Sequence, residues 1–337
     1  MIPAIDIAPL FGPASPARDA CDRAIAGAAA ETGFMTVTGI PDAALLSPEL
    51  RRALLAIFAL PAAAKAPLVR RAFDATRPNV YRGWFPLQAG EFSYKEGIDI
   101  GPDVAYPERP TDPSDPLLEP TPFPDEALLP GWRAAAARYY RGMEQVGQAL
   151  NRAIARGLGL AETSFDAAFD GGISSLRLAH YPERGADSLG QRDPATLQVE
   201  IAGRRHWLVN VPHVDSGCVT LLAQNGVEGL QARMLDGTWV TVPPTEGTLA
   251  INFGKLLERW TGGRIRATEH RVVSLKGDRH SVPFFYEPRV DAEIAPMPLP
   301  GVEPFAPFLY GDHLWAATTK FVEQRGIAHL RPPRRAA

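Results

Sequence analysis

Two histidines and one aspartate in the second half of the chain have a spacing that could bind a metal ion. His213 and Asp215 are separated by one residue, and in a β-strand residues i and i+2 point to the same face. The pair would therefore offer an imidazole nitrogen and a carboxylate oxygen to one ion. His270 begins another strand-like run, so it could complete the set if the two strands meet at one end of a barrel.

Two histidines and one carboxylate leave metal coordination positions open, an arrangement typical of non-haem Fe(II) oxygenases. Open positions allow O2 and an electron donor to bind beside a substrate, whereas a closed four-ligand site would be structural. A His-x-Asp triplet also arises by chance in a chain with seven histidines. By spacing alone, the trio is compatible with a metal site and with three ordinary core or surface groups.

Arg279 and Ser281 form a second pair with i, i+2 spacing. A guanidinium beside a hydroxyl on one strand face could bind a carboxylate through charge-assisted hydrogen bonds. Tyr181 could add a third donor. The alternative is an ordinary surface arginine in the turn at residues 277–279, which contains Gly277 and Asp278.

The bulk composition predicts a globular protein that acts on a small molecule. The 337 residues are 45% hydrophobic and 22% charged, with a formal net charge of −3. Basic residues cluster only at the last few positions, so the chain lacks the electrostatic pattern for nucleic acid or an anionic membrane. The sequence does not set the oligomeric state and is compatible with a monomer.

Two distant cysteines, Cys21 and Cys218, indicate neither a disulfide framework nor a thiolate zinc site. The first residues lack the basic start and long apolar run of a secretory signal, and no stretch reaches membrane-spanning length. We therefore expect a cytoplasmic protein.

Residues 1–130 are predicted to be mixed α and β. Residues 2–10 indicate a strand, and Ser15-Pro16 begins a helix that ends near Gly33. Nine prolines within residues 102–130 exclude regular structure and predict either a flexible linker or a loop that packs over a site.

Residues 131–330 are predicted to form the catalytic core, with residues 331–337 as a disordered tail; the two larger regions would form one integrated unit. Residues 132–158 have the apolar spacing of a long helix. Short β-type runs follow it, which favours a sandwich, jelly roll or barrel. These runs are 176–181, 207–211, 219–222, 239–242, 248–253, 270–275 and 282–286.

Motifs along nearly the whole chain resemble the Fe(II)/2-oxoglutarate-dependent oxygenases related to isopenicillin N synthase. The opening segment at residues 2–7, Glu31-Thr32-Gly33-Phe34 and residues 81–85 and 95–97 are similar to the family's N-terminal part. The more specific motifs come later. They are His213-Val214-Asp215, Thr220-Leu221-Leu222, Gly229-Leu230-Gln231, Asn252-Phe253-Gly254, residues 257–261, His270-Arg271-Val272 and Arg279-His280-Ser281.

The resemblance implies a mainly β fold with flanking helices, whose core is a double-stranded β-helix, a distorted jelly roll. It assigns Fe(II) to His213, Asp215 and His270, and the 2-oxoglutarate carboxylate to Arg279 and Ser281, with Tyr181 in support. The reaction it implies consumes O2, converts 2-oxoglutarate to succinate and CO2, and hydroxylates a small molecule or oxidises it in a related way.

One departure concerns Ala179, where many plant members of the family have an asparagine two residues before the tyrosine. A contact with the co-substrate would then be missing or supplied by another residue.

Two alternatives to this function stay open at this point. An oxidase like isopenicillin N synthase would use the same residues, with the arginine, serine and tyrosine holding the carboxylate of its own substrate. A catalytically silent barrel could bind a small carboxylate or a partner protein, although it would have little reason to retain three metal ligands.

Residues outside the shared motifs would shape the substrate pocket. The candidates are Arg82, Trp84, Arg177, Asn210 and Phe285, each of which could instead be an ordinary core or surface group. Residues 191–207 form either a lid hairpin or an exposed loop.

Overall fold

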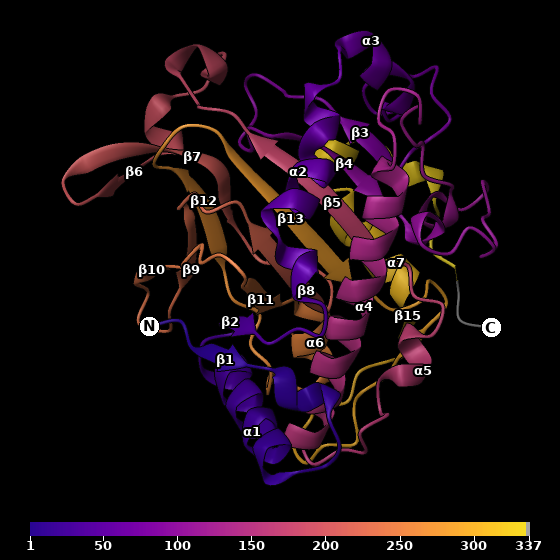
Figure 1. Cartoon of the computed structure of the whole chain (residues 1–337), viewed down its shortest axis with the longest axis vertical. Coiled ribbons are helices and arrows are strands. Elements are labelled where there is room, and N and C mark those ends of the chain that lie inside the picture. The colour runs from indigo at the N-terminus through magenta and orange to yellow at the C-terminus, as the bar shows by residue number, and fades with distance from the viewer. Residues whose placement is uncertain (335–337) are drawn as a thin grey trace.

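Two β-sheets form the centre of the molecule, and helices cover the larger one (Figure 1). The computed structural model describes residues 1–334. The larger sheet has eight strands in the order β1-β2-β11-β8-β13-β5-β4-β3, and the smaller has five in the order β10-β9-β12-β7-β6. Except for the parallel pair β1 and β2, neighbouring strands of both sheets are antiparallel.

The strands of the larger sheet come from both halves of the chain. Their bounds are Ala4–Asp6 (β1), Phe34–Thr38 (β2), Gly83–Phe85 (β3), Glu96–Ile100 (β4), Ser175–Tyr181 (β5), Val219–Gln224 (β8), Leu249–Phe253 (β11) and Arg279–Tyr286 (β13). Thus the N-terminal region adds four strands to a sheet whose other four come from residues 175–286.

The smaller sheet lies against one face of the larger. Its strands are Gln198–Ile201 (β6), Arg204–His213 (β7), Leu230–Arg233 (β9), Trp239–Thr241 (β10) and His270–Ser274 (β12). A buried apolar cluster contains residues of both sheets, among them Phe34, Ala179, Val209, Leu230 and Val272. This arrangement is the double-stranded β-helix that the sequence predicts, which confirms the expected fold class. A separate pair of strands, Glu293–Ile294 (β14) and Phe308–Leu309 (β15), lies near the C-terminus.

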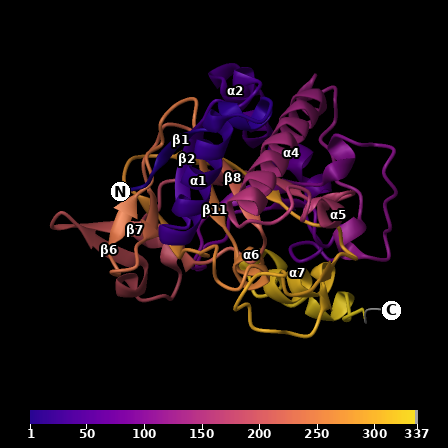
Figure 2. The ribbon, with the colours of Figure 1, turned by 90° about the horizontal axis from the view of Figure 1, so that it is seen from below.

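Helices cover the other face of the larger sheet, and the C-terminal helix lies on the opposite side of the molecule (Figure 2). The helices are Pro16–Glu31 (α1), Pro48–Leu55 (α2), Ala62–Lys65 (α3), Trp132–Gly157 (α4), Asp166–Phe169 (α5), Lys255–Trp260 (α6) and Tyr310–Thr318 (α7). No helix in residues 1–334 is both long and apolar enough to cross a membrane.

The signals in the sequence account for the ends of these helices. The Ser15 side chain accepts a hydrogen bond from the Arg18 backbone N–H at the start of α1. Gly33 has a φ of +63° just after α1, the left-handed conformation that commonly ends a helix. The apolar face of α4 packs on β13, where the rings of Tyr140 and Phe284 meet edge to face with centroids 4.9 Å apart.

The first predicted strand is shorter than expected. Residues 2–10 contain only a three-residue strand, β1, and a 3-10 helix follows at Ala8–Phe11. Pro9 explains the difference, because proline has no backbone N–H for a strand ladder and fits the first turn of a helix.

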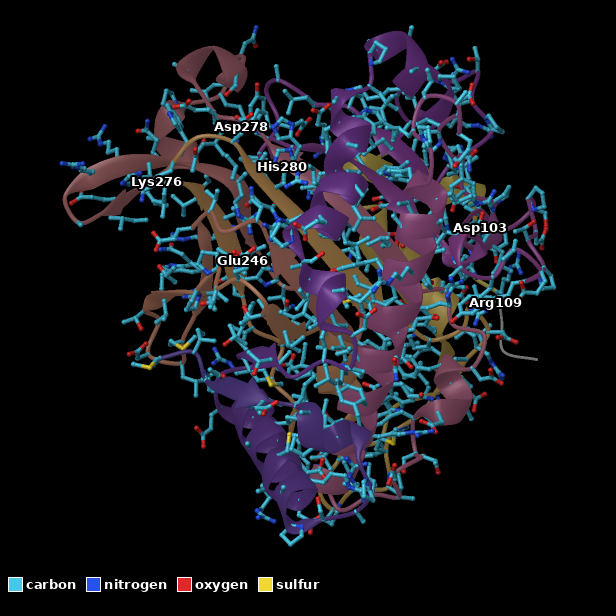
Figure 3. The ribbon with its side chains drawn as sticks, viewed as in Figure 1. Asp103, Arg109, Glu246, Lys276, Asp278 and His280 are labelled. Carbon is cyan, nitrogen blue, oxygen red and sulfur yellow. The ribbon has the colours of Figure 1, made fainter. Side chains whose placement is uncertain are left out.

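The proline-rich segment, residues 102–130, is not a flexible linker. The Glu119 carboxylate is buried and accepts hydrogen bonds from the backbone N–H groups of Val80 and Tyr81, at 2.8 and 2.7 Å. The Asn79 amide donates to the Pro120 carbonyl at 2.6 Å. Figure 3 marks Asp103 and Arg109 of this segment, on the side of the molecule opposite the β6–β7 hairpin.

The prediction of a disordered tail is wrong for residues 331–334. Arg331 is buried, and its guanidinium donates to Asp115 at 2.8 Å and to Asp312 at 2.7 Å. These two ion pairs tie the C-terminus to the proline-rich segment and to α7, which no local sequence signal reveals. The rest of the predicted tail, residues 335–337, lies outside the described residues.

Replacing Glu119 should destabilise the protein, because Glu119→Ala leaves several buried backbone N–H groups without an acceptor. We expect the free energy of unfolding to fall by about 2–4 kcal/mol, measured by urea denaturation. Glu108→Ala, at an exposed position of the same segment, is the control and should change it by less than about 0.5 kcal/mol. Equal effects of the two substitutions would mean that the segment is not held by Glu119.

Candidate metal centre and active site

Strand pairing brings His213, Asp215 and His270 together between the two sheets. His213 ends β7, His270 begins β12, and the two residues are register partners in the antiparallel pair. Asp215 follows β7, and its Oδ1 lies 3.8 Å from His213 Nε2 and 3.7 Å from His270 Nε2. One ligand atom from each residue lies within 4.8 Å of the other two, so a single metal ion could contact all three.

Backbone carbonyls orient both imidazole rings. His213 Nδ1 lies 2.8 Å from the Val211 carbonyl, and His270 Nδ1 lies 3.1 Å from the Thr268 carbonyl. A carbonyl oxygen only accepts, so each Nδ1 must carry the proton when its ring is neutral. Each Nε2 then has a free lone pair directed toward Asp215, which is the arrangement that metal-binding histidines generally show.

Two side chains hold the Asp215 carboxylate in place. The Thr220 hydroxyl and the Asn252 amide donate to its Oδ2, at 2.6 and 2.7 Å. Thr220 and Asn252 are register partners on β8 and β11, so the larger sheet supplies this support. Oδ1 is left to face the two histidines.

The electrostatics favour the protonation states that bind a metal. Burial, and then the neighbouring His270, lowers the pKa of His213 to about 4, so the ring is neutral near pH 7. Burial disfavours ionisation of Asp215, but the two histidines and the donors Thr220 and Asn252 hold its pKa below the usual value. His213 and Asp215 thus present a neutral nitrogen and an anionic oxygen, which suit a divalent transition metal.

A buried guanidinium faces the same cavity. Arg279 on β13 is the register partner of Tyr181 on β5, and its guanidinium lies 5.2 Å from the centre of the Tyr181 ring. Its Nη2 donates to Gln224 at 3.2 Å, while its buried Nε has no hydrogen-bond partner. Burial lowers the pKa of Arg279.

Among the side chains that the structure describes, no carboxylate lies within ion-pairing distance of Arg279. A buried cation without a counter-ion is unfavourable, so this position suits an anionic ligand. Ser281 and Tyr181 line the cavity with Arg279, and Ser281 stands on the same strand face.

Three of the five substrate-pocket candidates line the cavity, which has a volume of about 290 Å³. They are Arg177, Asn210 and Phe285. The Asn210 amide lies 3.5 Å from His213 Nε2 and accepts a hydrogen bond from Ser93 at 2.6 Å.

Arg82 and Trp84 do not line the cavity, which corrects that prediction. Trp84 packs against Phe58, with ring centroids 5.5 Å apart, and under the ammonium of Lys65. Arg82 is buried and donates to the Ile173 carbonyl at 3.3 Å. Arg82 and Trp84 are two residues apart at β3, so both side chains lie on the face of the sheet that points away from the site.

Residues 191–207 contain a hairpin of β6 and β7, but none of them lines the cavity. The hairpin projects from one side of the molecule (Figure 1).

Ala179 is fully buried in the apolar cluster between the sheets, so a contact with a co-substrate would have to come from a neighbouring side chain.

Sequence reasoning missed a second group of cavity residues. They come from two segments at residues 91–99 and 314–325, and they include Glu91, Lys95, Asp99, Lys320 and Glu323. More than two hundred residues separate the two segments, so no local spacing could indicate that they meet. The only sequence signal for this group was Lys95, which belongs to a motif that the chain shares with the 2-oxoglutarate-dependent oxygenases.

The fold and this cluster define a class of protein: a double-stranded β-helix with two histidines and one carboxylate at an open cavity, as in non-haem iron oxygenases. Comparison with known proteins narrows the class. Residues 174–288 match the 2OG-Fe(II) oxygenase superfamily, and residues 2–126 match the N-terminal region of non-haem dioxygenases described from morphine synthesis.

Individual relatives span most of the chain. The 2-oxoglutarate-dependent dioxygenase htyE of Aspergillus rugulosus is 30% identical over 314 residues, covering 84% of this chain and 86% of the relative. Isopenicillin N synthase of Streptomyces clavuligerus is 27% identical and covers 96% and 97%. The crystal structure of a full-length Neurospora crassa protein in complex with alpha-KG and 5-formyluracil has a TM-score of 0.74 at 25% identity, covering 93% and 94%.

The chain therefore belongs to the 2OG-Fe(II) oxygenase superfamily. It is an oxidoreductase that uses Fe(II), 2-oxoglutarate and O2, as the sequence predicts. An oxidase that does not use 2-oxoglutarate is not favoured.

One further acid lines this cavity. Glu287 follows β13, is buried, and accepts a hydrogen bond from the Tyr310 hydroxyl. Burial, reinforced by Asp215 and partly offset by the Tyr310 hydrogen bond, raises the pKa of Glu287 from 4.5 to about 8. The folded protein therefore holds a proton between pH 4.5 and 8 that the unfolded chain releases.

This proton makes stability depend on pH. The contribution of Glu287 is fully present below pH 4.5 and is lost as the pH rises through about 8. We expect the metal-free protein to lose a few kcal/mol of unfolding free energy between pH 5 and 9, measured by urea denaturation at a series of pH values.

Glu287→Gln, which stays neutral, should flatten this profile. The control Glu303→Gln, at an exposed position, should leave it unchanged. A profile equally steep in Glu287→Gln would contradict a protonated Glu287.

Proposed function

We propose that His213, Asp215 and His270 bind the catalytic Fe(II). The proposal rests mainly on the convergence of two oriented Nε2 atoms and one free carboxylate oxygen within 4.8 Å. The carbonyls of Val211 and Thr268 fix the ring orientation, and Thr220 and Asn252 fix the carboxylate. These partners hold the three side chains in the orientation that a metal ion requires.

Arg279 and Ser281 hold the distal carboxylate of 2-oxoglutarate in this proposal. The unpaired Nε of Arg279 supports it, because a carboxylate there would satisfy both the charge and the free donor. The Tyr181 ring supports the guanidinium through a cation–π contact. When bound beside the three ligands, iron supplies O2 activation, which couples decarboxylation of 2-oxoglutarate to oxidation of a C–H bond.

Arg177, Asn210 and Phe285 contact the substrate, which is a small molecule. Their positions on the cavity wall support this role, as does the Neurospora crassa protein, whose structure is a complex with 5-formyluracil. Asn210 is placed to orient the substrate beside the metal, since its amide lies next to His213 Nε2. A cytoplasmic location stays a prediction, with which two unpaired buried cysteines agree.

The metal assignment can be tested by anaerobic titration. Fe(II) and then 2-oxoglutarate are added to the purified protein, and chelation of iron by 2-oxoglutarate should produce a visible charge-transfer band. His213→Ala should lose at least about ten-fold in iron affinity, since one of three protein ligands is removed.

His280→Ala is the matched control for His213→Ala. His280 (Figure 3) follows Arg279 on β13 but points to the other face, where its ring stacks on His180 with centroids 4.4 Å apart. The His280→Ala variant should retain both iron and the charge-transfer band. Equal loss of iron in the two variants would contradict the ligand assignment, and bound iron without a band would indicate an oxidase.

The co-substrate assignment predicts a specific loss in Arg279→Gln. We expect its affinity for 2-oxoglutarate, measured through the same band, to fall roughly 100-fold because a buried charge-assisted contact is lost. Iron affinity should change little. The control Arg271→Gln removes another buried arginine, one that stacks on Trp239 outside the cavity, and should leave 2-oxoglutarate affinity unchanged; an equal loss there would contradict the assignment.

A further inference from the structure

A buried ion network forms the wall of the cavity beside Phe285. Asp99 is paired with Arg70 and accepts two hydrogen bonds from Arg177, at 2.6 and 2.7 Å. Glu323 Oε1 lies 3.0 Å from Lys95 Nζ and 3.8 Å from Arg177 Nη1. The side chains of all five residues are at most 18% exposed. Three cations thus face two carboxylates, and the network has one uncompensated positive charge.

The rim of the cavity is also positive. Glu91 pairs with both Arg192, at 3.4 Å, and Arg325, at 3.2 Å. Lys320 lines the same opening, and within the described part of the chain no carboxylate pairs with it. The rim therefore has two cations, Lys320 and Arg325, for one carboxylate, in a chain whose formal net charge is −3. Arg192, which does not line the cavity, adds a third positive charge beside Glu91.

The iron end of the cavity is balanced without help from this wall. Under the proposed function, Fe(II) and Arg279 carry three positive charges, and Asp215 and 2-oxoglutarate carry three negative ones. The co-substrate consequently leaves the excess charge at Lys95 and Arg177 uncompensated. Because uncompensated charge in a low-dielectric wall is costly, an anion that binds there gains both a partner and favourable desolvation.

Apolar groups lie on the same side of the cavity. Phe285 is on the wall, and the Arg177 guanidinium lies 5.6 Å from the centre of its ring. Phe92 and Phe321 line the opening and are 42% and 39% exposed. Phe321 also approaches His213, with ring centroids 6.5 Å apart. Exposed aromatic side chains at the mouth of a cavity are suited to contact an apolar ligand.

From these observations we infer that the oxidised substrate is a small organic acid. Its carboxylate binds at Lys95 and Arg177, and its apolar part lies between Phe285 and Phe321, toward His213. The inference deepens the proposed function and rests on it, because the iron end is taken as the place of oxidation. The positive rim assists by raising the local concentration of anions.

A cationic substrate fits this wall less well. Both buried carboxylates, Asp99 and Glu323, already have cationic partners, so a further cation would increase the excess charge. A neutral substrate would leave that excess as it is. Only an anionic substrate would neutralise the excess positive charge of the network.

Paired ligands test the charge requirement directly. Binding of benzoate and 4-phenylbutyrate is compared with that of the corresponding primary amides by calorimetry. The full chain is used, with and without Fe(II) and 2-oxoglutarate under anaerobic conditions. The carboxylates should bind at least about ten-fold more tightly than the amides, the difference expected for one charge-assisted hydrogen bond.

Two substitutions in the wall should have opposite effects. Lys95→Gln removes a positive charge and should weaken carboxylate binding about ten-fold, while Lys95→Arg should restore it. Glu323→Gln removes a negative charge and should strengthen carboxylate binding. If the two residues only held the wall together, both neutral substitutions would weaken binding alike. The control is Lys276→Gln. Lys276 is in the turn between β12 and β13 (Figure 3) and does not line the cavity, so its replacement should have no effect.

The inference is overturned if no carboxylate binds, if the amides bind as tightly, or if Lys95→Gln and Glu323→Gln change binding in the same direction. The charge-transfer band separates this outcome from failure of the proposed function. Carboxylate binding without the band would leave the charged wall correct and the proposed use of iron with 2-oxoglutarate wrong. A band without a preference for carboxylates over amides would leave the proposed function correct and the charged wall wrong.

Discussion

Strand register is the constraint on which the site depends. His213 is opposite His270, Thr220 is opposite Asn252, and Arg279 is opposite Tyr181. Successive side chains of a strand point to opposite faces, so a slip of one residue would turn each of these groups out of the cavity. The β-bulge in the pairing of β12 with β7 falls beside the histidines, where bulges commonly redirect a side chain.

Register is itself enforced by the apolar packing of helices on the larger sheet. On β13, Arg279, Ser281 and Phe285 face the cavity, whereas Val282 and Phe284 are buried under the helices. Moving the strand by one position would expose those apolar side chains to the cavity and place Arg279 in the apolar core, at a cost of several kcal/mol. The packing of α4 on this sheet therefore stabilises the chemistry on its other face.

Local spacing predicts the parts of the site that one strand or one turn provides. His213 with Asp215 and Arg279 with Ser281 could be found because the i, i+2 rule places both members on one face. The regular β-type runs predicted β5, β7, β8, β10, β11, β12 and β13 to within a few residues but missed β6 and β9 of the smaller sheet. The motif resemblance supplied the arrangement of the strands. Arg82 and Trp84 were misplaced because β3 is too short for a sequence pattern to fix which face is buried. The anchoring of Arg331 depends on Asp115, which lies more than two hundred residues earlier, so no local rule could predict it.

The two ends of the cavity obey different physical requirements. Iron binding requires fixed distances between the ligand atoms and a fixed tautomer of each histidine. Strands β7 and β12 provide both, with the help of backbone partners such as the Val211 carbonyl. The charged wall instead joins residues 91–99 to residues 314–325, through ion pairs such as Lys95 with Glu323 and Arg325 with Glu91. Lys95 and Glu323 lie outside the strands, so their side chains can be exchanged without changing the register of any core strand. Substrate preference can therefore diverge at Lys95 and Glu323 while His213, Asp215 and His270 stay in place, because the two groups belong to separate structural elements.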